Sequence, residues 1–229
     1  MSLDALPQLV SGLVFASVLM IVLWVIQRLT ADAGIVDVGW SGCLGVLALF
    51  YAMTLPHPSW RSGFVAVMAA IWSLRLATYL LFNRVVGKPE DGRYQSLRAR
   101  YGARVQTFFF WFFQAQAALA WLFSIPFWIA MRREGPAPDV ADLIGMALWL
   151  IAISGEAISD WQLARFRANP ANKGRTCRNG LWHYSRHPNY FFEWMHWWVY
   201  VIVAWQAPLG WITLFAPALM LYFLFRVTG

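Results

Sequence analysis

The sequence predicts an all-α polytopic membrane protein, with seven transmembrane helices in a single bundle. Three observations lead to this prediction. The 229 residues are 60% hydrophobic and only 13% charged, whereas about a quarter of the residues in a soluble domain are charged. The apolar residues form runs close to the roughly 20 residues that a membrane-spanning helix needs. The positive residues gather in the connections between these runs. We therefore expect residues 1–229 to form one transmembrane domain.

Each span is predicted from an apolar run and from the residues that interrupt it. The first run lacks the basic flank of a cleaved signal peptide, so we expect it to be retained. Pro56, Pro58, Gly135 and Pro208 separate later runs, because such residues interrupt regular helices. The expected spans are about 7–28, 35–55, 62–86, 107–131, 139–165, 189–206 and 209–227.

The basic residues predict the orientation of these spans. The connections after the third and fifth spans each carry six Lys or Arg residues, whereas the loops on the other side hold three. Loops rich in Lys and Arg stay in the cytoplasm. We therefore expect an integral protein of the bacterial inner membrane, with its N-terminus outside and any cofactor site facing the cytoplasm.

The segment 180–193 carries the densest group of polar residues beside an apolar run. Asn189, Glu193 and Trp197 fall four residues apart. A helix that begins near Pro188 would place all three on one face. A carboxylate in a membrane helix is costly and usually functional, so this face is a candidate site.

The basic connection from Arg165 to Arg186 has two interpretations. It is either a topology signal that contacts lipid headgroups, or an anion site, because guanidinium groups form paired hydrogen bonds with phosphate oxygens. Arg167 and Arg175 flank the turn at 169–174 and are the first candidates for such a site. The sequence has no GxGxxG motif and no P-loop, so any nucleotide site is not of the Rossmann or Walker type.

Three further acidic residues leave alternatives open. Asp160 and Glu156 lie one turn apart. They pair with Arg165 or Arg167, cap solvated helix surface, or bind the ribose hydroxyls or carboxamide of a cofactor. Asp37, beside Trp40 at the start of the second span, is either interfacial, a partner of Arg75, or a ligand for a substrate oxygen. A carboxyl group in an apolar pocket tends to stay protonated, and it can then donate a hydrogen bond to a carbonyl.

The histidines and cysteines do not indicate a metal site or a disulfide. His183 and His187 have the i,i+4 spacing of helical metal ligands, but His187 precedes Pro188, which disfavours helix at that point. We expect no metal. Cys43 and Cys177 give no disulfide framework and are expected to be free thiols. The +7 charge lies in loops between spans, so we expect no nucleic-acid partner. No protein partner is inferred, and membrane lipids are the expected surroundings.

The string Gly180-Leu-Trp-x-Tyr-Ser-Arg-His-Pro-Asn-Tyr-x-x-Glu193 resembles the steroid 5α-reductase family, in its bacterial branch of short membrane proteins. Asp160, Arg167 and the blocks 90–94 and 225–229 fit the same pattern in the same order. The similarity covers most of residues 35–229 and is strongest over 158–197. Isoprenylcysteine and phospholipid methyltransferases carry a string similar to Arg-His-Pro-x-Tyr.

The resemblance implies an NADPH-dependent oxidoreductase similar to 3-oxo-5α-steroid 4-dehydrogenase. Such an enzyme reduces the C=C bond of a conjugated enone in a steroid or steroid-like lipid, which enters from the bilayer. The resemblance implies catalytic roles for Asp37 and Glu193 and substrate contacts for Asp37, Trp40 and Trp72. The residues that it implies for cofactor binding are Asp160, Arg167, Arg175, Tyr184, Asn189 and Glu193.

The chain departs from the family pattern at three points. Asp37 matches a carbonyl-binding glutamate but is a shorter acid, and Trp72 stands where the family has a tyrosine, so the proton donor is unassigned. Family members continue into a cytoplasmic tail with further cofactor contacts, and this tail is either cut off at Gly229 or absent from the protein. Two rival functions remain. They are an S-adenosylmethionine-dependent methyltransferase of the isoprenylcysteine type and a non-catalytic lipid-binding membrane protein.

Overall fold

The computed structural model describes residues 5–226, and all the regular elements in that range are helices. The chain divides into two compact units, Met1–Trp128 and Ile129–Gly229, which are described separately below. The prediction of a single domain is not tested by this division. Residues 227–229, which close the seventh expected span and the C-terminal block of the family pattern, lie outside the described residues.

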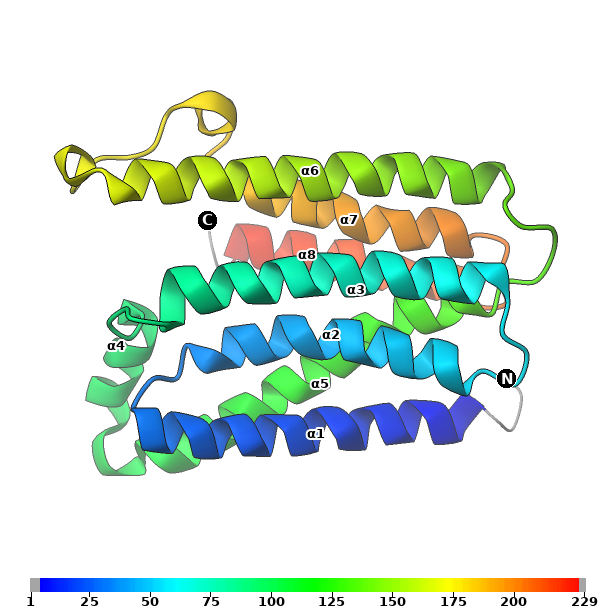
Figure 1. Cartoon of the computed structure of the whole chain (residues 1–229). Coiled ribbons are helices and arrows are strands. Elements are labelled where there is room, and N and C mark those ends of the chain that lie inside the picture. The colour runs from blue at the N-terminus through cyan, green and yellow to red at the C-terminus, as the bar shows by residue number, and fades with distance from the viewer. Residues whose placement is uncertain (1–4, 227–229) are drawn as a thin grey trace. The chain divides into compact units, whose positions relative to one another are not determined.

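The first unit contains four helices and most of a fifth. They are α1 (Ala5–Thr30), α2 (Ile35–Thr54), α3 (Trp60–Leu80), α4 (Gly92–Tyr101) and α5 (Val105–Met131), with short turns η1 (Leu81–Val85) and η2 (Gly102–Arg104). Within this unit α2 packs between α1 and α3, and α4 lies across one end of these helices (Figure 1).

Small residues and a shared hydroxyl hold α2 against α3. The Ser73 hydroxyl donates to the backbone carbonyl of Ser41 and accepts a 3.0 Å hydrogen bond from the backbone N–H of Gly45. A Cβ at Gly45 would lie 2.8 Å from the Cβ of Ser73, so only glycine permits this approach. Small residues allow close packing of membrane helices, where the hydrophobic effect contributes little to their association.

Polar side chains join α1 to α5. Gln27 donates to the Gln106 side chain at 2.7 Å, and Ser17 donates to Gln114 at 2.5 Å. The Trp24 indole N–H donates to the backbone carbonyl of Gln106 at 3.2 Å. Each interhelical hydrogen bond of this kind contributes about 0.6 kcal/mol in a membrane, so the set fixes the register of the two helices.

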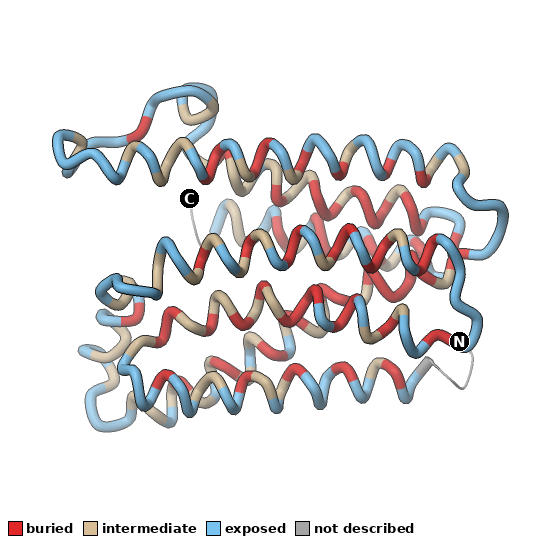
Figure 2. The backbone as a smooth tube through the Cα atoms, in the orientation of Figure 1, coloured by how far each residue is buried: buried red, intermediate tan, exposed pale blue. Residues whose placement is uncertain are grey.

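The second unit is built on a long antiparallel pair of helices. Its elements are α6 (Val140–Ala168), η3 (Pro170–Asn172), η4 (Gly180–His183), α7 (Pro188–Ala204), η5 (Gly210–Leu214) and α8 (Phe215–Arg226). Buried and exposed positions alternate along α6 with the helical period (Figure 2). Gly155 lies on the buried face, where a Cβ would come within 2.4 Å of the Phe192 ring on α7.

A buried ion cluster closes the end of this unit opposite the η3–η4 connection. Arg133 is 3% exposed and donates to the Val203 carbonyl at 2.9 Å. Its guanidinium also pairs with Asp139 and, at 3.5 Å, with Asp142. Asp139 and Asp142 form the reciprocal N-terminal cap of α6. The cluster therefore ties the start of α6 to the end of α7.

Among the described residues, five helical stretches are long and apolar enough to cross a membrane. Four of them begin and end within three residues of the first, second, third and fifth expected spans, whereas the fourth, Gly92–Met131, begins 15 residues before the expected span 107–131 because α4 precedes α5. The five stretches identify the chain as an integral membrane protein. The sixth and seventh expected spans are also helical, but α7 has 17 residues and the apolar stretch Gly210–Arg226 is equally short. The seven-span topology is not confirmed and stays a prediction.

Candidate functional site

Four polar residues lie on two successive turns of the α6–α7 contact. The Asn189 amide N–H donates to Asp160 at 3.1 Å. Glu156 lies one turn before Asp160 on the buried face of α6, and Glu193 lies one turn after Asn189 on the buried face of α7. Asp160 is 3% exposed, Glu156 2% and Glu193 8%. Because the helices are antiparallel, Asp160 lies opposite Asn189, and Glu156 lies near the level of Glu193.

The start of α7 sets this register. His187 has non-helical backbone, with φ of −141° and ψ of 62°, and Pro188 occupies the first turn of the helix. Proline suits that position because it needs no N–H donor there. The prediction that a helix begins near Pro188 is confirmed. Asn189, Glu193 and Trp197 therefore share a face, as their spacing indicated, and Glu193 and Trp197 are both buried.

The segment before α7 folds back onto α6 beside this cluster. The Trp182 indole N–H donates to the Ser159 carbonyl at 2.9 Å, and the backbone N–H of Leu181 donates to the Gln162 side chain at 2.9 Å. Gly180 has a φ of +60°, and a Cβ there would clash with the Gln162 amide. The residues of the Gly180-Leu-Trp string therefore have a structural role, because they hold this turn against α6 next to Asp160.

One acceptor of the cluster remains unused. The amide oxygen of Asn189 is buried and has no hydrogen-bond partner among the described residues. A buried acceptor without a donor costs free energy. A primary amide or a hydroxyl of a bound molecule would supply the missing donor, and the neighbouring carboxylates would accept further hydrogen bonds from it.

The predicted cationic residues do not join this cluster directly. Arg167 lies exposed in the last turn of α6, and Arg175 lies exposed in the connection. Within the described range neither side chain has a hydrogen-bond or ion-pair partner. Tyr184 is 86% exposed. All three side chains border the α6–α7 site along the chain and remain free to bind an anion.

A second cluster lies in the first unit, at the start of α2. One oxygen of Asp37 accepts from Arg93 at 3.0 Å, and the other accepts from the Tyr94 hydroxyl at 2.9 Å. Arg93 also binds Asp91, and this hydrogen bond holds the pKa of Asp91 below its ordinary value. Tyr94 is 3% exposed. This pairing with α4 takes the place of the Arg75 pair that the sequence left open for Asp37, and its interfacial position stays a prediction.

The two predicted tryptophans lie on α2 and α3. Trp40 packs edge-on against Phe123, with ring centroids 5.9 Å apart, and its buried indole N–H has no partner in the described part of the chain. Trp72 is fully buried on α3. Trp40 lies one turn beyond Asp37, so its N–H is a further donor near the Asp37 cluster. An oxygen of a bound molecule would satisfy it.

Sequence reasoning missed one residue of the Asp37 cluster and one residue of a separate cavity. Tyr94 is the hydroxyl partner of Asp37, and the only signal for it was its place in the 90–94 block. Arg165 was considered as part of a basic connection and as a partner for Asp160 or Glu156, and not as a cavity residue, yet it lines a cavity of about 330 Å³ beside η4. Among residues 5–226 no group of three His, Cys, Asp or Glu is placed to hold a metal ion.

The fold and these clusters define an α-helical integral membrane protein with buried carboxylates where α6 meets α7. Residues 23–229 match the family described as protein of unknown function (DUF1295), and the chain belongs to that family. No curated protein and no solved structure matches the chain.

Proposed function

We propose that this protein is a membrane-embedded reductase that uses NADPH to reduce the C=C bond of a conjugated enone in a steroid-like lipid. The observation that carries the proposal is the buried group of Asp160, Asn189, Glu156 and Glu193. Buried carboxylates in a membrane helix pair are costly to maintain and mark functional sites. The resemblance to the steroid 5α-reductase family supplies the reaction class.

The chemistry of the cluster fits a nicotinamide cofactor. When bound, NADPH would supply the hydride. The unused amide oxygen of Asn189 matches the N–H₂ group of a carboxamide. Glu193 and Asp160 would accept from the remaining amide and ribose donors. In this arrangement oxygen atoms of the protein orient the cofactor by accepting hydrogen bonds from its N–H and O–H groups. The packing around Trp197 excludes water.

The exposed cations fit the phosphate groups of the same cofactor. Arg167 follows Asp160 by seven residues on α6, about two helical turns, so one elongated molecule can reach both residues. Arg175 and Tyr184 lie in the connection that returns to α7. Guanidinium groups without partners bind phosphate through paired hydrogen bonds, and Tyr184 offers a hydroxyl.

The Asp37 cluster fits the polarisation of a substrate carbonyl. A carbonyl oxygen accepts hydrogen bonds, whereas both oxygens of Asp37 already accept them from Arg93 and Tyr94. The Tyr94 hydroxyl has a single proton, which it donates to Asp37 in this structure. We assign this hydroxyl as the donor to the carbonyl once it turns from Asp37 toward the bound substrate, and Asp37 holds it in place until then. Reduction adds a hydride to the β-carbon and a proton to the enolate. Tyr94 is our candidate for holding that proton, since Trp72 has no hydroxyl.

The finer topology belongs to the same proposal. Seven spans would require α7 and the Gly210–Arg226 stretch to cross the bilayer, although each is shorter than the first five. The basic connections would then lie in the cytoplasm, where NADPH is available, and the N-terminus would lie outside. Cysteine labelling at Ser2 and in the 88–104 loop tests this orientation, which predicts that the two sites react from opposite sides.

The decisive experiment compares cofactors and substrates in the full-length protein. Thermal unfolding in detergent is measured with NADPH, NADH and S-adenosylmethionine, followed by NADPH oxidation with a panel of steroid-like enones. We expect stabilisation by NADPH and enone-dependent oxidation. Stabilisation by S-adenosylmethionine alone would establish the methyltransferase alternative. Binding of the enones without any turnover would favour a lipid-binding protein.

A further inference from the structure

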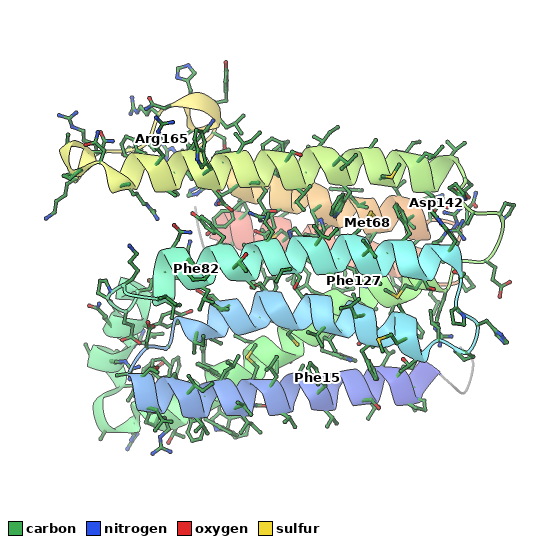
Figure 3. All side chains as sticks on the ribbon, in the orientation of Figure 1. Phe15, Met68, Phe82, Phe127, Asp142 and Arg165 are labelled. Carbon is green, nitrogen blue, oxygen red and sulfur yellow. The ribbon has the colours of Figure 1, made fainter. Side chains whose placement is uncertain are left out.

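A cavity of about 330 Å³ lies on the outer side of α6, beside the η3 and η4 turns. It is distinct from the Asp160 cluster, which occupies the opposite, buried face of α6. Its walls come from the end of α6 and from the connection that follows, and they include Trp161, Gln162, Arg165 and Asn169. Figure 3 labels Arg165 at this end of α6.

The charge of the cavity is entirely positive. Arg165 is the only ionisable residue in the lining, which contains no carboxylate. Its guanidinium lies over the Trp161 ring, 5.4 Å from the ring centroid, and has no ion-pair partner among residues 5–226. The ring holds the side chain in place while its N–H groups remain free. An isolated guanidinium held in a cavity is suited to bind an anion.

Two of the four amide side chains of the lining, those of Gln162 and Asn169, are turned so that they can donate, whereas Asn172 already donates to the Phe166 carbonyl at 2.9 Å. The oxygen of Gln162 accepts from the backbone N–H of Leu181 at 2.9 Å, and the oxygen of Asn169 accepts from the backbone N–H of Ala171 at 3.0 Å. Both oxygens are therefore occupied, and the N–H₂ groups of both residues are left without acceptors. Together with Arg165, the cavity offers three side chains whose free groups are all N–H donors.

The position of the cavity along α6 identifies the source of the anion. The 29 residues of α6 span about 44 Å, which exceeds the roughly 30 Å of bilayer hydrocarbon. The apolar part of the helix ends near Asp160, so Trp161 and Arg165 lie at the level of the lipid headgroups. Trp161 is 57% exposed, as is typical of tryptophan at a membrane interface.

We propose that this cavity binds the phosphate of an anionic phospholipid headgroup, through Arg165 and the amides of Gln162 and Asn169. The exposed face of Trp161 packs against the acyl chains of the lipid where they join the glycerol. This assignment does not rest on the proposed reductase function, because none of these four residues belongs to the candidate cofactor or substrate sites.

The test is native mass spectrometry of the full chain, released from detergent after incubation with equal amounts of phosphatidylglycerol and phosphatidylcholine. Arg165→Gln removes the cation. Asn169→Asp keeps the oxygen that accepts from Ala171 but replaces the N–H₂ donor with a negative charge. Arg178→Gln is the matched control, because Arg178 is an exposed arginine of the same connection that lies outside the lining.

We expect wild type and Arg178→Gln to retain phosphatidylglycerol preferentially, and both cavity variants to lose about tenfold in its retention, as the loss of a charge-assisted hydrogen bond implies. Equal retention by Arg165→Gln and wild type would overturn the proposal, as would an equal loss in Arg178→Gln. Displacement of the lipid by excess inorganic phosphate would assign the cavity to a soluble phosphate instead.

Discussion

The hydroxyl of Tyr94 gives the most direct test of the Asp37 cluster. Tyr94→Phe removes the donor to Asp37, which lies 2.9 Å away, and leaves Arg93 on the other carboxylate oxygen. The ring is retained, so its edge contacts with Phe109 and Phe112 are retained as well. The variant therefore changes one hydrogen bond and almost no packing.

The expected loss of stability is small. A hydrogen bond to a charged group contributes about 1.5–3 kcal/mol. The Asp37 side chain is 23% exposed, so water replaces part of the lost bond, and we expect about 1–1.5 kcal/mol. The expected loss of activity is much larger. If Tyr94 supplies the proton, enone-dependent NADPH oxidation should fall by about 10²–10⁴-fold in kcat, with little change in the KM for NADPH.

Tyr101→Phe is the matched control for this variant. Tyr101 ends the same helix and stacks on Phe108, with ring centroids 4.0 Å apart, but its hydroxyl has no partner within the described residues. It should keep wild-type stability and activity. The two measurements separate the roles of Tyr94. A Tyr94→Phe enzyme with reduced thermal stability and a kcat within a factor of about two of wild type would refute the proton-donor role and leave a structural hydrogen bond.

Three further outcomes are expected. Glu193→Gln keeps the side-chain volume but removes a buried carboxylate, so it should fold and bind NADPH while losing most hydride transfer. A wild-type rate of enone reduction would contradict its cofactor role. Arg167→Ala and Arg175→Ala should each weaken NADPH binding by about 1.5–3 kcal/mol, measured by titration in detergent, and unchanged affinity in both would leave them as topology signals. Arg133→Met should destabilise the protein by about 3 kcal/mol, because it leaves Asp142 buried without that cation. Denaturation by titrated detergent measures this loss, and a smaller effect than that of an exposed Arg178→Met would refute it.

The sequence alone predicted the elements that depend on local patterns. The first five spans follow from apolar runs, and the helices end where prolines and glycines interrupt those runs. The start of α7 was equally predictable, because Pro188 suits the first turn and the residue before a proline avoids helix. The four-residue spacing of Asn189 and Glu193 then fixed their common face without reference to any other element.

The partners of these residues were not predictable in the same way. The contact between Asp37 and Tyr94 joins positions 57 residues apart, and it depends on how α4 lies across the end of its unit. Arg165 looked like any other basic residue of its connection. Its role in a cavity appears only because Gly180 and Leu181 fold back onto Gln162. The periodicity of a sequence predicts which residues share a face of a helix, but it does not predict which residues of other elements contact that face.

The α6–α7 cluster shows how local patterns and packing combine. Asp160 and Glu156 share the buried face of α6 by their spacing, and Asn189 and Glu193 share that of α7. The two pairs meet because Gly155 lets Phe192 approach the α6 backbone, which sets the helices close together at this level. A larger residue at position 155 would push the helices apart and stretch the 3.1 Å bond between Asn189 and Asp160. The candidate site therefore depends on Gly155, although this residue has no functional group that could bind a ligand.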